Sequence, residues 1–410
     1  MEPRIAVVGG GAAGLVAALE AARAGAPVAL LERGKALGRK ILASGGGRCN
    51  LTHRDIRPER YHGGGGVRDL VGEALSGFDA AWARAYFEGL GLMLMSEPDG
   101  RVFPRCGRSR AVVDVLQAAL NELGADIRLN AGVAAVEKDG EGFLLRLESG
   151  GDLRARSVVL CCGGPSYPQL GGSGSGPALA ESLGHSCVAA APALVPLRVK
   201  ESWVKMLDGI RVEAALRAEA EGRTVAESRG ELLFTAYGIS GPAALDLSRE
   251  ALRALAGGRV SCAVDLFPEW GDGEFRKLLE ERALRFGRRS LAGFLTGMLP
   301  GRLPEVFLEQ QGLGPHDRVE ALGAAGLEAL QRGLKGWRFE LLGPRPWEEA
   351  MVSSGGVSLP EVDPGSLESR KAPGLFLAGE LLDVDGDSGG FNLHFAWASG
   401  ARAGRAASTR

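Results

Sequence analysis

The sequence predicts an α/β protein with a Rossmann-like dinucleotide-binding domain, and three observations predict it. The chain opens with a strand, a glycine-rich turn, a helix and a second strand. After about Pro192 the pattern changes to short strands followed by helices, and residues 346–410 return to glycine-rich turns. At 410 residues the chain is long for a single core, so we expect two or three domains.

The opening segment is typical of a dinucleotide site. Arg4 to Val8 reads as a strand, an alanine-rich helix follows, and a second strand, Val28 to Leu31, ends at Glu32. The turn between the first strand and the helix contains Gly9, Gly11 and Gly14. This spacing lets the backbone approach a pyrophosphate at the helix N-terminus, and Glu32 can accept the ribose hydroxyls. The segment therefore predicts FAD or NAD binding.

A second glycine-rich segment, Gly38 to Thr52, is predicted to be a loop against the cofactor. Three consecutive glycines, residues 45–47, disfavour a helix or strand interior, and Arg39, Lys40 and Arg48 flank them. Basic groups in such a loop suit a phosphate or an electron-rich ring. Cys49 has no resolving partner nearby, so we expect packing, and a redox role stays open.

Residues 111–176 are predicted to form one helix, four strands and a loop. Apolar residues recur at helical spacing in Ala111 to Leu123. The predicted strands are 127–129, 133–137, 143–147 and 154–161. The last strand ends at Gly163-Gly164, where we expect the backbone to approach the same dinucleotide. Ser166 to Gly176 lacks a following acidic strand end, so it predicts no second nucleotide site.

Residues 192–335 have a different character. Strands are predicted at 194–199, 210–216, 231–234 and 259–265, and helices at 272–286, 290–299, 304–311 and 317–330. The basic residues of the helical part are Arg276, Lys277, Arg282, Arg285, Arg288 and Arg289. Because glutamates are interspersed among them, we interpret them as the solvated face of a helix.

The C-terminal part carries a further glycine-rich turn. A strand, Leu375 to Ala378, leads into Gly379-Glu380, and Gly389-Gly390 precedes a helix. Such a helix N-terminus can face the flavin edge on which negative charge develops during reduction. Asp383, Asp385 and Asp387 alternate as calcium ligands would, but the terminal glutamate of a calcium loop is missing. We therefore expect no metal.

Composition excludes several classes of protein. A hydrophobic fraction of 45% without a long apolar stretch predicts no membrane span, and a formal net charge of −2 gives no general attraction to nucleic acid. The six cysteines form no C-x-x-C pair, which predicts a reducing cytoplasm without disulfides or zinc. The expected partner is a small-molecule substrate, with no nucleic acid and no membrane.

Four segments together resemble the bacterial BaiN/YhiN-like flavoprotein family over nearly the whole chain. They read GRKILASGGGRCNLT, ELLFTAYGISGPAALDLSR, RPWEEAMVSSGGVSLPEVDPGSLESR and GLFLAGELLDVDGDSGGFNLHFAWASG. The resemblance implies an FAD-binding domain split into residues 1–190 and 346–410. It also implies an insert, 191–345, made of a β-barrel-like part (191–267) and a helical bundle (268–335). Where the family pattern has a histidine after Thr235, this chain has Ala236.

The expected FAD contacts lie in the glycine-rich segments and at the strand ends, and the FAD is expected to be non-covalent. They are Gly9, Gly11, Ala12, Ala13, Gly14, Glu32, Arg33, Lys40, Ser44, Gly45, Gly46, Arg48, Cys49, Asn50, Val133, Gly163, Gly379, Glu380, Gly389, Gly390, Phe391, Asn392 and Leu393.

The reaction stays open among three readings. The resemblance implies an FAD-dependent oxidoreductase that reduces an activated C=C bond, with NAD(P)H as a transient electron donor. The alternatives are an oxidase or dehydrogenase of a small amine or alcohol, and a non-enzymatic or RNA-associated flavoprotein. No catalytic residue is assigned: Arg105, Tyr167, Tyr237 and His394 are polar candidates with equally plausible structural roles.

Overall fold

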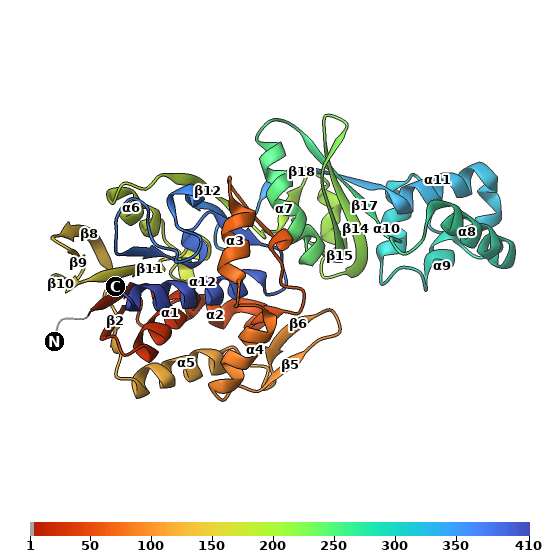
Figure 1. Ribbon diagram of the computed structural model, residues 1–410. Helices are drawn as coiled ribbons and strands as arrows, with labels where there is room; N and C mark the ends of the chain where they lie inside the picture. The colour runs from red at the N-terminus through yellow and green to blue at the C-terminus, as the bar shows by residue number, and fades with distance from the viewer. Residues whose placement is uncertain (1–3) are drawn as a thin grey trace. The chain divides into compact units, whose positions relative to one another are not determined.

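The chain folds into two units, each with its own hydrophobic core. The structure, a computed structural model, describes residues 4–410. The first unit comprises residues 1–192 and 351–410, and the second unit comprises residues 193–350. The first unit is therefore discontinuous in sequence (Figure 1).

A five-stranded sheet forms the centre of the first unit, with strand order β20-β11-β1-β2-β7 and every neighbouring pair parallel. The strands are β1 (Ile5–Val8), β2 (Val28–Leu31), β7 (Asp126–Arg128), β11 (Ser157–Leu160) and β20 (Leu375–Leu377). β1, β2 and β11 are buried at every position. Their nearly continuous apolar runs are typical of a parallel sheet that is covered on both faces.

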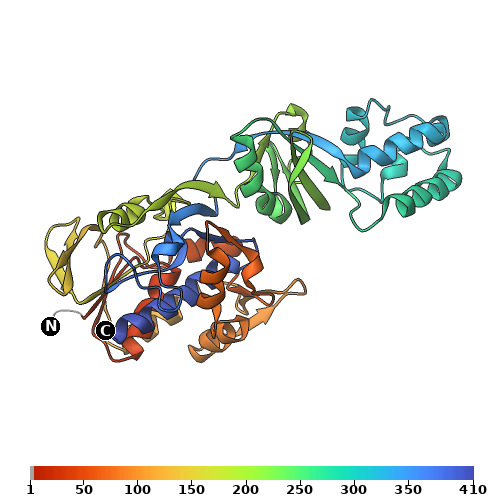
Figure 2. The same ribbon diagram turned by 45° about the horizontal axis from the view of Figure 1, so that its top comes forward.

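The first and last helices of the chain lie side by side in this unit (Figures 1 and 2). The helices are α1 (Ala12–Arg23), α2 (Arg39–Ala43), α3 (Val67–Leu75), α4 (Ala80–Gly89), α5 (Arg110–Glu122), α6 (Ser175–Ser182) and α12 (Phe391–Ser408). A Cβ atom at Gly400 or Gly404 of α12 would lie 2.3 or 2.2 Å from the carbonyl oxygens of Ala13 and Ala17 in α1. The two backbones are in contact because neither glycine carries a side chain.

Smaller sheets surround the central one. They are β8 (Val133–Asp139) with β9 (Gly142–Leu147) and β10 (Asp152–Ala155); β3 (Thr52–His53) with β6 (Arg101–Pro104) and β5 (Leu94–Ser96); β12 (Cys187–Ala193) with β19 (Val352–Val357); and β4 (Tyr61–Gly63) with β21 (Val384–Gly386).

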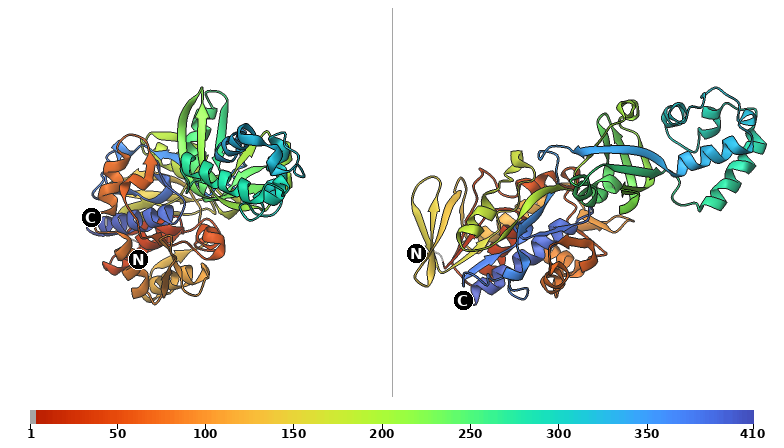
Figure 3. Two further views of the ribbon diagram at one scale, coloured as in Figure 1. Left: turned by 90° about the vertical axis from the view of Figure 1, so that its right-hand side faces the viewer. Right: turned by 90° about the horizontal axis from the view of Figure 1, so that it is seen from above.

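The second unit contains a closed barrel and a group of helices (Figure 3). The barrel strands are β13 (Leu197–Val199), β16 (Gly238–Ser240), β15 (Arg223–Thr235), β14 (Arg211–Ala220), β17 (Val260–Asp265) and β18 (Trp337–Pro344). The helices are α7 (Gly241–Leu255), α8 (Asp272–Phe286), α9 (Leu291–Leu295), α10 (Leu303–Gln310) and α11 (Gly323–Lys335). The Trp337 ring packs 5.4 Å from Phe307 of α10 and 5.9 Å from Phe234 of β15, which joins barrel and helices in one core.

The structure confirms the strand predicted at 4–8, which is β1, the strand at 28–31 and the helix at 272–286, and corrects other elements. The predicted strand 154–161 is two strands, β10 and β11, because the backbone breaks at Arg156 where the chain passes from one sheet to another. The predicted loop 38–52 contains helix α2, because good helix formers precede the glycines.

Two predicted helices also have wrong bounds. The helix predicted at 290–299 is limited to α9 because Gly297 adopts a φ of 88°. The helix predicted at 317–330 begins at Gly323, after a turn in which Asp317 accepts a hydrogen bond from the Gly314 amide, and continues to Lys335. Helices α3, α4, α6 and α7 had no sequence prediction.

Candidate functional site

Four predicted cofactor residues lie at the carboxyl ends of neighbouring strands of the central sheet. Gly9 follows β1 and Glu32 follows β2, while Gly163 and Gly379 come just after β11 and β20. The carboxyl ends of parallel strands meet at one edge, and β1 lies between β2 and β11, where the strand order reverses. The fold thus gathers these four positions at the edge where α/β sheets bind ligands.

The turn between β1 and α1 is tightly packed except at one point. A Cβ atom at Gly14 would lie 1.8 Å from the Gly9 carbonyl oxygen, and one at Gly9 would lie 2.5 Å from the Cys161 carbonyl oxygen. A Cβ at Gly11 would meet nothing within 4 Å. Open space in front of the first amides of α1 fits a cofactor pyrophosphate.

Glu32 holds the backbone around this turn. Its Oε2 accepts a hydrogen bond of 2.7 Å from the Gly10 amide, and its Oε1 accepts one of 2.7 Å from the Gly34 amide. A carboxylate has about four acceptor sites, so two remain for ribose hydroxyls. The Ala131 amide donates to the Glu32 carbonyl, which places buried Val133 two residues from the same strand end.

The second glycine segment keeps an open backbone, although it is helical at its start. In the 3-10 turn at residues 44–47, Gly45 and Gly46 adopt φ angles of 56° and 64°, which favour glycine. A Cβ at Gly46 or Gly47 would meet nothing within 4 Å. The turn therefore leaves room for a ligand to touch the backbone.

Two predicted arginine contacts are already engaged by carboxylates. Arg33 pairs with Glu148 at 2.7 Å, and Arg48 pairs with Glu97 at 2.8 Å. The Arg48 guanidinium also lies 4.1 Å from the centre of the Phe103 ring. These contacts fix both side chains, and their FAD contacts stay predictions.

Lys40 and Glu380 form one polar cluster, which the sequence had indicated only as two separate positions. The Lys40 Nζ donates to Glu380 Oε2 and to Ser166 Oγ, both at 2.6 Å. Glu380 Oε1 accepts from Ser166 Oγ at 2.8 Å and from the Ser353 amide and hydroxyl at 2.9 Å. Burial alone would raise the pKa of Glu380, but Lys40 and the two serines hold that pKa below its ordinary range.

The turn before α12 lies against the second glycine segment. Gly389 and Gly390 adopt φ angles of 115° and 109°, and a Cβ at Gly390 would lie 2.9 Å from Asn50 Oδ1. Among residues 4–410, this buried Asn50 oxygen has no hydrogen-bond donor. An orphaned acceptor beside a helix N-terminus fits a ligand that carries an N–H group, as the flavin ring does.

The side chain of Asn392 and the backbone of Phe391 support this turn. The Asn392 amide oxygen and nitrogen bond the Gly386 N–H and carbonyl at 2.8 Å each. Tyr61 donates to the Phe391 carbonyl at 3.1 Å. The side chain of Asn392 is therefore engaged within the protein, and a cofactor contact of Phe391 to Leu393 through the backbone stays a prediction.

A histidine–aspartate pair beside the same turn had no sequence prediction. His62 Nε2 lies 2.7 Å from Asp387 Oδ1, and Arg60 donates to Asp387 Oδ2 at 3.2 Å. Burial raises the pKa of Asp387, but the hydrogen bonds and charges of these two neighbours hold it below its ordinary range. The pair arises because β4 and β21, far apart in sequence, lie antiparallel with His62 opposite Asp385.

The polar candidates of the sequence lie in different places. His394 is buried between Thr52 Oγ1 and the Phe78 carbonyl, both at 2.8 Å, and burial lowers its pKa to about 4, so its role is structural. Tyr237 belongs to the second unit, where it donates to Glu349 at 3.4 Å. Tyr167, in the first unit, adopts a φ of 52°. Arg105 is exposed.

The exposure of the cysteines allows a direct test of whether Cys49 has a redox role. Cys49 is fully buried, and burial raises the pKa of its thiol to about 12 although Ser44 opposes the shift. Cys106 is exposed. We expect native protein at about pH 8 to react rapidly with a disulfide reagent such as DTNB at Cys106, while Cys49 reacts only after unfolding. The fast phase should disappear in Cys106→Ser and remain in Cys49→Ala. Rapid labelling of Cys49 in the native protein would instead support a redox role for this cysteine.

The described residues offer neither a metal site nor a membrane-spanning helix. Between residues 4 and 410, no group of three or more metal-ligating side chains could hold a metal ion. Within the same range, no helix has the length and apolar character needed to cross a bilayer.

Comparison with known proteins shows the family to which the chain belongs. The model of the HI0933-like protein Rossmann domain matches residues 3–406. A 3-dehydro-bile acid delta(4,6)-reductase of Clostridium scindens is 37% identical over 410 residues, covering 99% of each chain. A ribosomal RNA dihydrouridine synthase of Escherichia coli is 33% identical over 397 residues, covering 96% of this chain and 95% of the relative.

Solved structures share the fold. A 3-ketosteroid-delta4-(5alpha)-dehydrogenase from Rhodococcus jostii superposes with a TM-score of 0.51 at 17% identity, covering 100% of this chain and 97% of the other.

Proposed function

Because the chain belongs to the family of HI0933-like proteins with a Rossmann domain, we propose that it is an FAD-dependent oxidoreductase that reduces an activated carbon–carbon double bond. The observation that carries the proposal is the full-length similarity to the bile acid reductase. The names of both curated relatives describe one chemistry, since dihydrouridine is uridine whose ring double bond has been saturated.

The proposed cofactor site uses the four strand ends and the two glycine turns. The amides at the start of α1 bind the pyrophosphate through the open space at Gly11, and Glu32 binds ribose hydroxyls. FAD, when bound, would accept a hydride from the donor and deliver it to one carbon of the double bond, while a proton adds to the other carbon. The positive end of α12 stabilises negative charge at the flavin edge, beside the orphaned Asn50 oxygen.

We propose NADH or NADPH as the electron donor. The sequence contains one complete nucleotide-binding motif, which the FAD occupies in this proposal. The pyridine nucleotide therefore binds transiently, as a second substrate.

A second candidate substrate is a uridine in RNA rather than a free small molecule. The E. coli relative supports this candidate at 33% identity. A group of exposed arginines in the second unit, described in the next subsection, favours it further. The reaction and the cofactor are the same in both cases.

We expect the purified protein to be yellow and to release all its FAD on acid precipitation. Flavin retained in the pellet would contradict non-covalent binding, and a colourless protein that takes up no added FAD would contradict the cofactor. Anaerobic mixing with NADH and with NADPH should bleach the flavin absorbance. A 3-oxo-4-ene steroid or a uridine-containing RNA should then restore it without oxygen. Bleaching by an amine or alcohol, with recovery only in oxygen, would point to an oxidase instead.

A further inference from the structure

The C-terminal end of helix α8 exposes arginines that have no acidic partner. Earlier on the helix, Arg276 pairs with Glu280 at 3.2 Å and Lys277 with Glu281 at 3.9 Å. Beyond them, exposed Arg285, Arg288 and Arg289 form no ion pair with any residue between 4 and 410. We call these three residues the arginine patch. The interspersed glutamates thus pair with the first half of this run, and its second half is exposed without them.

An aromatic ring orients the arginine patch. The guanidinium of Arg289 lies 4.2 Å from the centre of the Phe286 ring, and that of Arg285 lies 5.2 Å from it. A guanidinium over a ring keeps the N–H groups at its edge free for other acceptors. Two planar forks are therefore held in place, and such forks match the oxygens of a phosphate.

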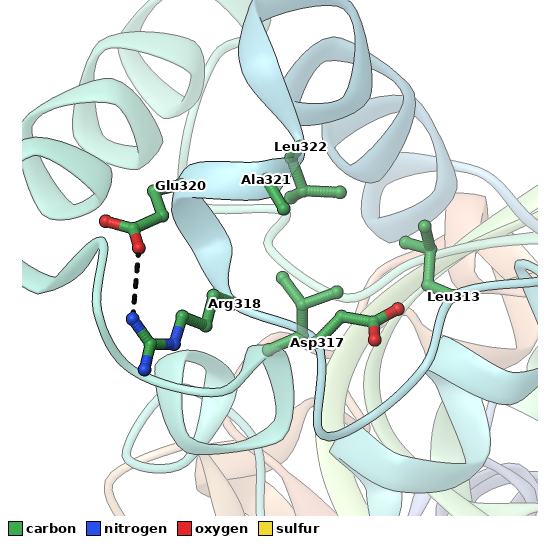
Figure 4. Close-up of a pocket in the computed structure, with 7 residues that line it drawn as sticks. Leu313, Asp317, Arg318, Glu320, Ala321 and Leu322 are labelled. Carbon is green, nitrogen blue, oxygen red and sulfur yellow. Dashed lines mark hydrogen bonds and ion pairs between the residues drawn. The ribbon is translucent and has the colours of Figure 1, made fainter.

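A hollow lies next to the arginine patch. The backbone of residues 287–291 is hydrogen-bonded to that of residues 317–320. The Glu320 amide donates to the Gly287 carbonyl, and the Val319 amide donates to the Arg289 carbonyl. Beside this contact, a pocket of about 400 Å³ is lined by Leu291, Leu313, Asp317, Arg318, Glu320, Ala321 and Leu322. Figure 4 shows Glu320 bonded to Arg318. Asp317 accepts a hydrogen bond from the Gly314 amide, so both acids already have partners.

We propose that this surface docks RNA, with backbone phosphates on the arginine patch and one unpaired base in the hollow. The inference rests on the RNA candidate of the proposed function and names where that substrate is held. Phosphate contacts position a nucleic acid without reading its sequence. The attraction of phosphates must come from the arginine patch itself, because the chain as a whole carries a formal charge of −2.

A membrane surface fits these observations less well. Helices that lie on a bilayer bury a wide apolar face in it. In α8, Phe275 and Leu279 are buried in the core of the second unit, and Leu284, which is 89% exposed, is an isolated apolar residue on the outer side. One leucine does not make such a face.

The test compares two triple variants that remove the same amount of charge. The first carries Arg285→Gln, Arg288→Gln and Arg289→Gln. The control carries Arg276→Gln, Lys277→Gln and Arg332→Gln, and each of these residues has a glutamate partner. Binding of the full-length holoprotein to a short fluorescein-labelled single-stranded RNA is measured by anisotropy over a range of salt concentrations. Losing three phosphate contacts should lower the slope of log affinity against log salt by about 2.

We expect the arginine-patch variant to bind roughly tenfold more weakly at low salt, and the control to bind as wild type does. Equal affinities and slopes for the two triples would overturn the proposal. So would a loss confined to anionic phosphatidylserine vesicles, with RNA binding unchanged. Ala321→Trp, which fills the hollow, should weaken the binding of single-stranded RNA but not that of duplex RNA. Equal effects on the two RNAs would show that no base lies in the hollow.

Reduction of a soluble 3-oxo-4-ene substrate separates this inference from the proposed function. The arginine-patch variant should keep that activity, because its substitutions lie outside the first unit. A wild-type protein that reduces no double bond would contradict the proposed function, while the RNA measurements would still decide the docking surface.

Discussion

Gly14→Ala is expected to abolish FAD binding and to destabilise the first unit strongly. The new Cβ would lie 1.8 Å from the Gly9 carbonyl oxygen, a backbone atom that cannot move without opening the turn between β1 and α1. The same substitution in an unconstrained helix interior stabilises by about 1 kcal/mol. Here we expect a loss of at least about 3 kcal/mol in the free energy of unfolding, which denaturant titration measures. The flavin content of the purified protein measures the loss of FAD binding.

Gly11→Ala is the matched comparison, because it separates the ligand from the fold. Gly11 has φ −80° and ψ −166°, which alanine adopts freely, and its Cβ would meet no protein atom within 4 Å. The apoprotein should therefore unfold as wild type does, while FAD binds at least about tenfold more weakly, a cost of roughly 1.4 kcal/mol. Wild-type FAD affinity in this variant would mean that the pyrophosphate does not lie at the start of α1.

Lys40→Met is expected to produce the largest loss among the side-chain substitutions. The side chains of Lys40 and Glu380 are only 29% and 20% exposed, so solvent screens their contact of 2.6 Å weakly. Removing the lysine leaves a carboxylate without its cation, which typically costs about 3 kcal/mol. Urea unfolding near neutral pH measures it. Lys35→Met is the control, because Lys35 is exposed and close in sequence.

The pH dependence of this effect has a definite sign. The pKa of Glu380 is lowered in the folded protein, so its contribution to stability is present above its unfolded value of 4.5 and is lost as pH falls through the folded pKa. The difference between wild type and Lys40→Met should therefore shrink below pH 4.5. Adding Glu380→Gln to Lys40→Met should recover most of the loss. A double variant as unstable as the single one would show that the ion pair is not the cause.

The elements that the sequence predicted well are those whose pattern is local. The first strand, turn and helix are specified by apolar runs and the motif glycines 9, 11 and 14, and α8 by helical spacing that ends at Gly287. The strand at 154–161 was wrong because its break at Arg156 depends on which neighbouring strand each half pairs with. Helix α2 was missed because the glycines that follow it dominated the interpretation.

In the candidate site, too, local patterns could be predicted from the sequence and contacts between distant residues could not. Glycine spacing alone indicated where a ligand could approach the backbone, and the structure leaves open space at Gly11 and Gly46. The partners of Glu380 were not predictable, because Ser166 and Ser353 lie far from it in sequence and serines are common. Helical spacing likewise could not tell a paired arginine from an unpaired one in α8.

The contact between α1 and α12 has a consequence for how a ribosome makes this protein. Strand β20 and helix α12 are synthesised only after residues 193–350, yet they complete the sheet and cover the first helix. The N-terminal part must therefore wait, with its apolar surface uncovered, while residues 193–350, which have their own core, are translated. Pairings this distant in sequence close slowly. The nascent chain is thus at greatest risk of aggregation or proteolysis before α12 has been synthesised, and truncations within α12 should accumulate as insoluble protein.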